Sequence, residues 1–355
     1  MKKKQFFLFF IFSISLLIPQ NYKITGNKGV WKNYLTVDGI SSNYIYDVFV
    51  DEDNSIWLST TSGVTQYNGS QFINYGTESG LPPSNIKNIL SISSGNIVAV
   101  SETNGAYKLK NGKFELISGL YGNTIYASSI DNNGNLVLTT EKGVFIYENG
   151  KFNAIINLGS KIITAIDYFK NEAWYGGKDK IYFDNGQSIE NYSLPNEFGQ
   201  VKVTSIVSSE SSESFIGTDK GLFKIKNGSL NRVKSFDNLS SNVIKSLYMD
   251  KEQNLWVGTD KGLYYNNGAN FTQIETTVES KNQIENQKIY SINFTNDRKI
   301  FIGTFGAGLF FYDPYSFRNL TNENIFKGTT VRSISKEKNN NVWLGTDDGL
   351  VHLKG

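Results

Sequence analysis

Short runs of hydrophobic residues, either alternating with polar residues or continuous, recur along the chain from about residue 45 onward and are separated by turns rich in glycine and asparagine. One unit appears eight times: an apolar strand, a tight turn and a second apolar strand. The turn contains glycine in nearly every copy, and the fourth copy has Lys180 in its place. The copies are Ile56–Val64, Ile97–Tyr107, Leu136–Phe145, Ala173–Tyr182, Ser214–Phe223, Leu255–Tyr264, Ile300–Phe310 and Val342–Val351.

Each copy is flanked by two further predicted strands. An apolar or alternating run precedes it, as at Ile45–Val50 and Val243–Met249. After most copies comes an Asn-Gly pair, which favours the positive φ angles of a two-residue hairpin turn, and then a short strand that often carries an aromatic residue. Repeats of four antiparallel strands, spaced by about 40 residues, predict a β-propeller.

The number of blades depends on how the two ends of the chain pair. Each of the first seven copies is followed by a fourth strand, which is Phe317–Leu320 in the seventh copy. The eighth copy has no such strand after it. Trp31–Tyr34 matches the fourth strand Phe72–Tyr75 and has no blade of its own. We therefore predict an all-β fold, a single eight-bladed β-propeller with a seven-bladed one as the alternative. We expect the N-terminal strand to pair with the last blade and close the ring, which would leave no exposed edge there.

The first residues have the features of an export signal. Lys2–Lys4 precede an apolar run, Phe6–Ile18, that is too short to span a bilayer comfortably. We assign residues 1–20 to a signal peptide, 21–28 to a short lead-in and 29–355 to the propeller domain. The expected location is the periplasm or the exterior of the cell, with a membrane attachment only if the signal segment is uncleaved.

Charge and rare residues limit the chemistry. The formal net charge of +2 becomes slightly negative without the three leader lysines, so no nucleic-acid partner is expected. The sequence has no cysteine, and His352 is its one histidine, so disulfides, zinc clusters and histidine-based triads lack members. Asp51–Asn54 and Asp131–Gly134 resemble calcium loops but are too short for one. We predict no metal, no cofactor and no enzymatic activity.

One copy of the repeat, DKEQNLWVGTDKGL at Asp250–Leu263, resembles the two-component regulator propeller repeat. The resemblance covers residues 31–355, and the second to fourth copies depart from it most. It implies a sensor propeller from the periplasmic part of a hybrid two-component regulator. Such regulators continue into a β-sandwich, a membrane helix, a kinase and often a DNA-binding domain, none of which is in this sequence, so no phosphorylation or transcription activity is expected of it.

Tryptophan recurs at one position of the repeat, on the second strand, in four copies. A sugar-stacking role is conceivable for these side chains. Because the position is a repeated structural one, packing between blades is the favoured interpretation. The four residues are Trp57, Trp174, Trp256 and Trp343.

The predicted binding face carries the turns between the second and third strands, here named the B–C turns, together with the loops that connect one repeat to the next. Strand direction alternates, so these two sets of connections share one face, and binding residues concentrate on such loops. The candidate ligand-binding residues are Glu141, Lys142, Lys178, Asp179, Asp219, Lys220, Asp260, Lys261, Phe305, Asp347 and Asp348.

These observations favour a non-catalytic, monomeric, secreted or periplasmic module that binds or senses a ligand. The expected partner is a glycan, a peptide or an envelope protein. The alternative is a scaffold subunit of an envelope or secretion complex. Two further interpretations stay open: a propeller lyase or hydrolase, because a fold does not determine a function, and a fragment of a longer hybrid histidine kinase sensor.

Overall fold

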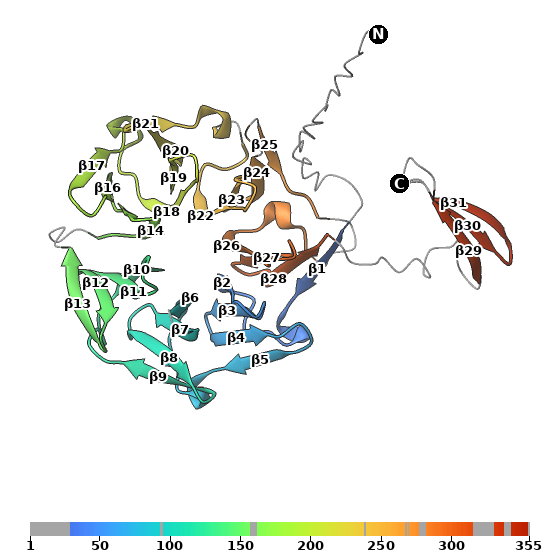
Figure 1. The fold of residues 1–355 in the computed structure, drawn as a ribbon, viewed down its shortest axis with the longest axis horizontal. Helices are drawn as coiled ribbons and strands as arrows, with labels where there is room; N and C mark the ends of the chain where they lie inside the picture. Colours follow the sequence, from blue (N-terminus) through green and yellow to red (C-terminus); the bar gives the residue numbers. More distant parts are fainter. Residues whose placement is uncertain are drawn as a thin grey trace, which may run out of the picture.

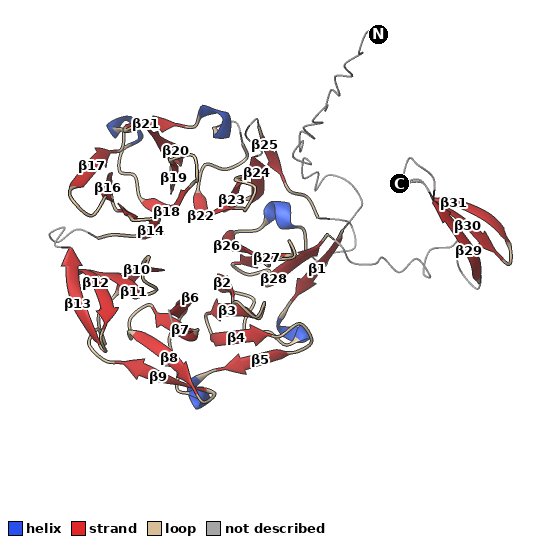
Figure 2. Cartoon of the chain, in the orientation of Figure 1, coloured by secondary structure: helices blue, strands red, loops and turns tan. Residues whose placement is uncertain are grey.

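The computed structural model describes residues 29–92, 95–156, 162–237, 239–266, 268, 270–276, 282–314, 330–336 and 342–353. The predicted signal peptide and lead-in lie outside these residues. The described part is all-β, as predicted, and consists of antiparallel sheets arranged as a β-propeller (Figure 2). It also contains short 3-10 helices: η1 (Thr36–Asp38), η2 (Thr77–Ser79), η3 (Asn196–Phe198), η4 (Lys234–Phe236) and η5 (Ile284–Asn286).

Seven four-stranded sheets surround a common centre (Figure 1). The first strand of each sheet lies innermost and contacts the first strand of the next sheet, and β26 contacts β2. These inner strands are β2 (Ile45–Val50), β6 (Ile86–Ile92), β10 (Ile125–Ile130), β14 (Ala165–Phe169), β18 (Val203–Ser208), β22 (Ile244–Met249) and β26 (Ile289–Phe294).

The outer strands follow in the predicted order. The second strands are β3 (Ile56–Thr60), β7 (Asn96–Ser101), β11 (Leu136–Thr140), β15 (Glu172–Gly176), β19 (Glu213–Thr218), β23 (Leu255–Thr259) and β27 (Ile300–Thr304). The third strands are β4 (Gly63–Tyr67), β8 (Ala106–Lys110), β12 (Gly143–Glu148), β16 (Lys180–Asp184), β20 (Gly221–Lys226), β24 (Gly262–Asn266) and β28 (Leu309–Asp313). The outermost strands are β5 (Phe72–Tyr75), β9 (Lys113–Ile117), β13 (Lys151–Ile156), β17 (Ile189–Ser193), β21 (Ser229–Arg232), β25 (Phe271–Gln273) and β1 (Val30–Tyr34).

The Asn-Gly pairs form hairpin turns in two ways. Asn111, Asn149 and Asn227 have φ angles of 52°, 53° and 50°, and the glycine after each also has a positive φ. This is the conformation of a type I′ turn, which matches the twist of the two strands that it joins. At Asn68 and Asn185 the side-chain oxygen instead accepts hydrogen bonds from backbone amides two and three residues later.

The glycine of the Gly-Thr pair on the second strand lets neighbouring sheets approach each other. A Cβ atom at Gly217 would lie 2.6 Å from Cγ2 of Ile244 on the next sheet, and one at Gly258 would lie 2.7 Å from Cγ2 of Ile289. Both distances are too short for real atoms, so the isoleucine fills the space that glycine leaves. A Cβ at Gly303 would lie 2.7 Å from Cγ2 of Ile45, so β27 packs on the sheet that begins with β2.

The predicted pairing of the N-terminal strand with the last repeat is wrong. β1 pairs antiparallel with β28, from Val30 opposite Asp313 to Tyr34 opposite Leu309. Trp31 is 8% exposed and its ring lies 4.9 Å from that of Tyr312. The N-terminal strand therefore completes the sheet of β26–β28. The expected fourth strand of that repeat, Phe317–Leu320, lies outside the described residues.

The eighth repeat forms a separate three-stranded sheet, so the predicted eight-bladed ring is also wrong. Its strands are β29 (Val331–Lys336), β30 (Val342–Thr346) and β31 (Gly349–Leu353), and Figure 1 shows them away from the ring. Ile334 is 72% exposed, whereas its equivalent Val48 is 2% exposed; Leu350 is 68% exposed, whereas its equivalent Val64 is fully buried. The repeat sequence alone thus forms the sheet, and only contact with neighbouring sheets buries its apolar faces.

The loops that resemble calcium sites are hydrogen-bonded turns. Oδ1 of Asp51 accepts the Ser55 amide at 2.8 Å, and its Oδ2 accepts the indole N–H of Trp57 at 2.9 Å. Oδ1 of Asp131 accepts the amides of Asn133 and Asn135. The carboxylates therefore fix the turns between first and second strands, and one of them also pairs with the buried tryptophan.

Candidate functional site

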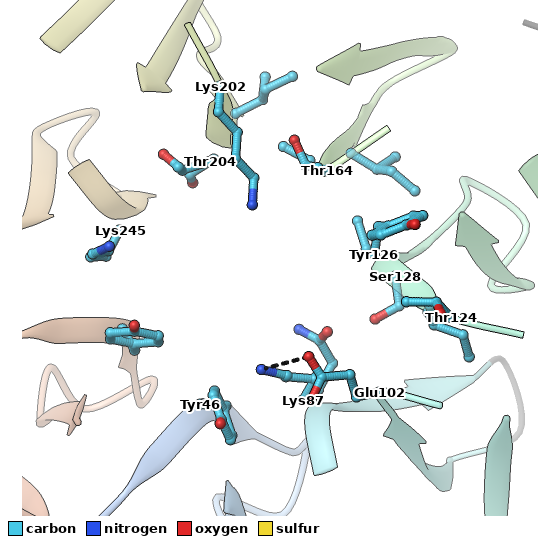
Figure 3. A pocket seen from close by; sticks show the side chains of 18 residues that line it. Tyr46, Lys87, Glu102, Thr124, Tyr126, Ser128, Thr164, Lys202, Thr204 and Lys245 are labelled. Carbon is cyan, nitrogen blue, oxygen red and sulfur yellow. Dashed lines mark ion pairs between the residues drawn. The ribbon is translucent and has the colours of Figure 1, made fainter. Parts of the chain in front are cut away.

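A pocket lies at the centre of the ring and is lined mainly by the inner strands. Its volume is about 500 Å³, within the range of sites that hold small ligands. Strands from every one of the seven ring sheets contribute to its lining (Figure 3). Neighbouring sheets pack on each other, but all seven come together only at this centre, so the pocket unites residues that are far apart in the sequence.

The inner strands share a local irregularity that shapes this pocket. In six of them the pairing register with the second strand shifts by one residue directly after the strand begins, which leaves one residue unpaired. Such a bulge turns a side chain in a new direction and is common next to binding sites. The unpaired residues all line the pocket: Tyr46, Lys87, Tyr126, Thr204, Lys245 and Tyr290.

The pocket carries a surplus of positive charge. Its lining includes Lys87, Lys202 and Lys245 and one carboxylate, Glu102. Nζ of Lys87 lies 3.3 Å from Oε1 of Glu102. Lys202 and Lys245 have no ion pair among the described residues, so the lining has two positive charges in excess of its negative charge. Figure 3 shows the Lys202 side chain extending into the pocket.

Aromatic rings cover one side of the pocket. Nζ of Lys87 lies 3.8 Å from the centre of the Tyr46 ring, and Nζ of Lys245 lies 5.7 Å from that of Tyr290. The Phe305 ring stacks on Tyr290 at 5.0 Å and lies 5.5 Å from Tyr46. Burial raises the pKa of Tyr290 above its ordinary value, so its hydroxyl stays neutral at physiological pH and is able to donate a hydrogen bond.

The predicted site residues lie on the B–C turns, and none of them lines the pocket. Phe305 comes nearest to it, through its packing on two pocket tyrosines, Tyr46 and Tyr290. Lys142, Lys220, Lys261 and Asp348 each donate a backbone amide to the threonine at the end of the second strand. The backbones of Lys178 and Lys202 form an isolated antiparallel β-bridge.

The acidic residues of these turns fasten the turn to the start of an inner strand. Oε2 of Glu141 accepts the Thr124 amide at 3.0 Å, and Oδ1 of Asp219 accepts the Lys202 amide at 2.9 Å. Three more carboxylates accept hydrogen bonds: Asp179 from the Val201 amide, Asp260 from the Ser241 hydroxyl and, in the eighth repeat, Asp347 from the Arg332 guanidinium. These five carboxylates thus have a structural role, and ligand binding by the candidate residues stays a prediction.

The pocket residues were missed because the bulge is not visible in the sequence. The unpaired lysines and tyrosines follow the first apolar residue of an inner strand, where regular alternation does not show which side chains face the centre of the ring. Lys202 directly precedes such a strand. The one available signal is that the unpaired position holds lysine or tyrosine in five repeats of the ring, at Tyr46, Lys87, Tyr126, Lys245 and Tyr290.

Two aspartates next to the pocket link the inner strands. Oδ1 of Asp47 accepts the Ser291 hydroxyl at 2.8 Å, and its Oδ2 accepts the Ile89 amide at 3.2 Å, so it joins β2 to β26 and to β6. Burial raises the pKa of Asp47, and these hydrogen bonds oppose the rise. Burial also raises the pKa of Asp167 on β14, whose Oδ2 is buried without a hydrogen-bond partner in the described part of the chain.

We expect Asp167→Asn to change how stability depends on pH. A raised pKa means that the folded protein binds a proton that the unfolded chain has already released, so this group favours folding below about pH 4 and disfavours it as the pH rises through the raised pKa. The effect of the substitution on the unfolding free energy should be more favourable at pH 7.5 than at pH 4, measured by urea unfolding at both values. Glu172→Gln, on the exposed side of the next strand, is the control. An equal change at both pH values would contradict the assignment.

The described residues contain no group of three or more histidine, cysteine, aspartate or glutamate side chains that could hold a metal ion. His352 lies on β31, where its ring stacks on Trp343 at 4.1 Å. No helix among the described residues has both the length and the apolar character needed to cross a membrane.

Two segments of the chain match the family model of the two component regulator propeller, residues 39–62 and 238–261. Both segments begin in the loop before an inner strand and end in the following B–C turn, so each covers the first half of a repeat. No curated protein matches the chain in sequence.

Solved structures share the fold at low sequence identity. The extracellular domain of the hybrid two component system BT3049 from B. thetaiotaomicron is 17% identical, with a TM-score of 0.69, over 92% of this chain and 48% of its own length. PorZ, a surface component of the type-IX secretion system of Porphyromonas gingivalis, is 15% identical, with a TM-score of 0.59, over 87% of this chain and 51% of its own. Virginiamycin B lyase from Staphylococcus aureus is 11% identical, with a TM-score of 0.63, over 80% of this chain and 99% of its own.

The chain spans about half the length of the extracellular two-component domains that it matches. At these identities the likeness shows the propeller fold, and the match to the repeat model adds the type of repeat.

Proposed function

We propose that this chain, which carries two component regulator propeller repeats, is an exported, non-catalytic module that binds a small ligand in its central pocket and serves in sensing. The single observation that carries the proposal is the set of bulged residues, which places lysine, tyrosine and threonine side chains from six inner strands around one pocket. The type of repeat and the likeness to extracellular domains of two-component systems support export and sensing.

The pocket chemistry supports binding without turnover. The one carboxylate in its lining, Glu102, is held by Lys87 and by the side-chain amide of Asn85, at 3.1 Å. A general acid or base has to reach a reacting group, and this side chain is already engaged on both of its oxygens. His352, the one histidine of the chain, lies on β31 and does not line the pocket.

A second candidate function is that of a scaffold subunit, and the likeness to PorZ favours it. A scaffold would bind a protein partner over a broad surface, and the B–C turns offer one. A small ligand would bind in the central pocket, whereas a protein partner would bind on the B–C turns. One variant at each place therefore distinguishes the two functions.

A ligand screen with two matched variants tests the proposal. Thr204→Trp fills the pocket from a position that is partly exposed, and Lys142→Trp adds the same side chain to an exposed B–C turn. We expect a ligand found by thermal shift among soluble glycans and peptides to lose at least tenfold in affinity in Thr204→Trp and less than twofold in Lys142→Trp.

Other outcomes would contradict the proposal. Loss of binding in Lys142→Trp alone would move the site to the B–C turns. Retention of a protein partner by both variants, with no small ligand found, would favour the scaffold. Conversion of a bound ligand to a product, followed by mass spectrometry, would show that the chain is an enzyme.

A further inference from the structure

The three pocket lysines reach the centre from three different sheets. Lys87 and Lys245 are bulge residues of β6 and β22, and Lys202 directly precedes β18. Because each lysine belongs to a separate sheet, the ring fixes the positions of the three backbones around the pocket. The mutual repulsion of the lysine charges in a concave pocket is relieved when an anion binds between them, and such a pocket concentrates anions from solution.

Lys202 and Lys245 are the two cations available to such an anion. Lys87 already pairs with Glu102 and lies over the Tyr46 ring. Lys202 is exposed, and its backbone amide, not its ammonium, is the group held by Asp219. Lys245 has only the Tyr290 ring near its ammonium among the described contacts, at 5.7 Å. An anionic group placed between these two lysines would gain two charge-assisted hydrogen bonds.

The rest of the lining has the chemistry that sugar rings require. Tyr46, Tyr126 and Tyr290 offer aromatic surface with a polar end, which suits a ring that is apolar on its faces and polar at its edge. The hydroxyl oxygens of Ser128 and Thr204 are buried and have no hydrogen-bond partner in the described part of the chain. Buried polar groups are normally paired, and both hydroxyls lie on residues that line the pocket, so a rotation about the Cα–Cβ bond would direct them to a ligand.

From these contacts we infer that the ligand of the central pocket is an acidic saccharide, with its carboxylate or sulfate between Lys202 and Lys245 and its ring against the tyrosines. This inference rests on the proposed function and gives it a ligand class. An acidic peptide fits less well, because peptides are usually bound in extended grooves or along sheet edges, whereas this pocket is enclosed by a ring of sheets. Its volume of about 500 Å³ favours a short oligosaccharide.

Calorimetry on the purified chain with matched probes tests the inference. The probes are trigalacturonate, its uncharged methyl ester, a sulfated chondroitin disaccharide and triglutamate. We expect trigalacturonate or the sulfated disaccharide to bind, and the methyl ester to bind at least tenfold more weakly than trigalacturonate if the carboxylate is the recognised group. Binding should weaken as salt is raised from 50 to 500 mM, since salt screens the charges.

Lysine variants assign the binding to the two unpaired cations. We expect the double variant Lys202→Gln with Lys245→Gln to lose at least tenfold in affinity and Lys202→Arg to retain most of it. Lys113→Gln, at an exposed lysine on the outermost strand β9, should change the affinity less than twofold. Thermal melts show whether each variant folds as the unchanged chain does.

The possible failures are distinguishable. Equal binding of the methyl ester and trigalacturonate, or tighter binding of triglutamate, would overturn the ligand class and leave the pocket as the site. If no acidic saccharide binds, but another ligand does and Thr204→Trp abolishes its binding, the ligand class is again overturned and the pocket is still the site. If no ligand responds to Thr204→Trp, the proposed function itself fails.

Discussion

A chain that begins at residue 37 is expected to melt about 10 °C or more below one that begins at residue 29. The shorter chain lacks β1, so the edge of β28 is unpaired and the burial of Trp31 against Tyr312 is lost. The loss of one such side chain costs about 3–5 kcal/mol, the lost backbone pairing adds to it, and each kcal/mol lowers the melting temperature by about 2–4 °C in a chain of comparable size. Calorimetry and size-exclusion chromatography measure the effect, because the exposed edge should also promote association.

A disulfide distinguishes the observed pairing from the one predicted with the last repeat. The chain has no cysteine, so two can be introduced without a competing thiol. Val30→Cys with Asp313→Cys should form an intrachain disulfide, since these residues are opposite each other on β1 and β28. Val30→Cys with His352→Cys should stay reduced. A disulfide in the second variant and none in the first would mean that β1 completes the sheet of β29–β31.

Trp256→Ala is expected to destabilise the protein by about 3–5 kcal/mol, measured by chemical unfolding. Trp256 is 1% exposed, and its ring packs on Tyr265 of its own sheet at 4.8 Å and on Phe294 of the next sheet at 5.2 Å. Its indole N–H donates to Oδ2 of Asp250 at 3.0 Å. The substitution therefore leaves a cavity between two sheets and a buried carboxylate oxygen without this donor.

Trp343→Ala is the matched control, because Trp343 occupies the same position of the eighth repeat. Its ring stacks on His352 of its own sheet and is only half-buried. We expect a loss of less than about 1.5 kcal/mol, since less apolar surface becomes exposed. Equal losses for both variants would show that the sheet of β29–β31 is packed in solution as firmly as the ring sheets.

The sequence by itself determined the strands, the turns and the type of repeat, because each depends on residues close together in the chain. The Asn-Gly pairs adopt the positive φ angles that they favour, as at Asn111 and Gly112. The aspartate of the repeat binds the tryptophan six residues later, as Asp51 does with Trp57. Even the eighth repeat, apart from the ring, forms its three strands as the pattern predicts.

Only the tertiary structure decided which strand closes the ring and which side chains meet at its centre. Gly303 and Gly345 hold the same position in the same motif, yet Gly303 packs on Ile45 of the first sheet, whereas the nearest side chain to a Cβ at Gly345 is Ser333 of its own sheet. The pocket lysines likewise come from sheets far apart in the sequence, and bulges turn two of them to the centre. Contacts of this kind depend on how sheets pack around a ring, and a pattern that every sheet shares carries no information about which sheets become neighbours.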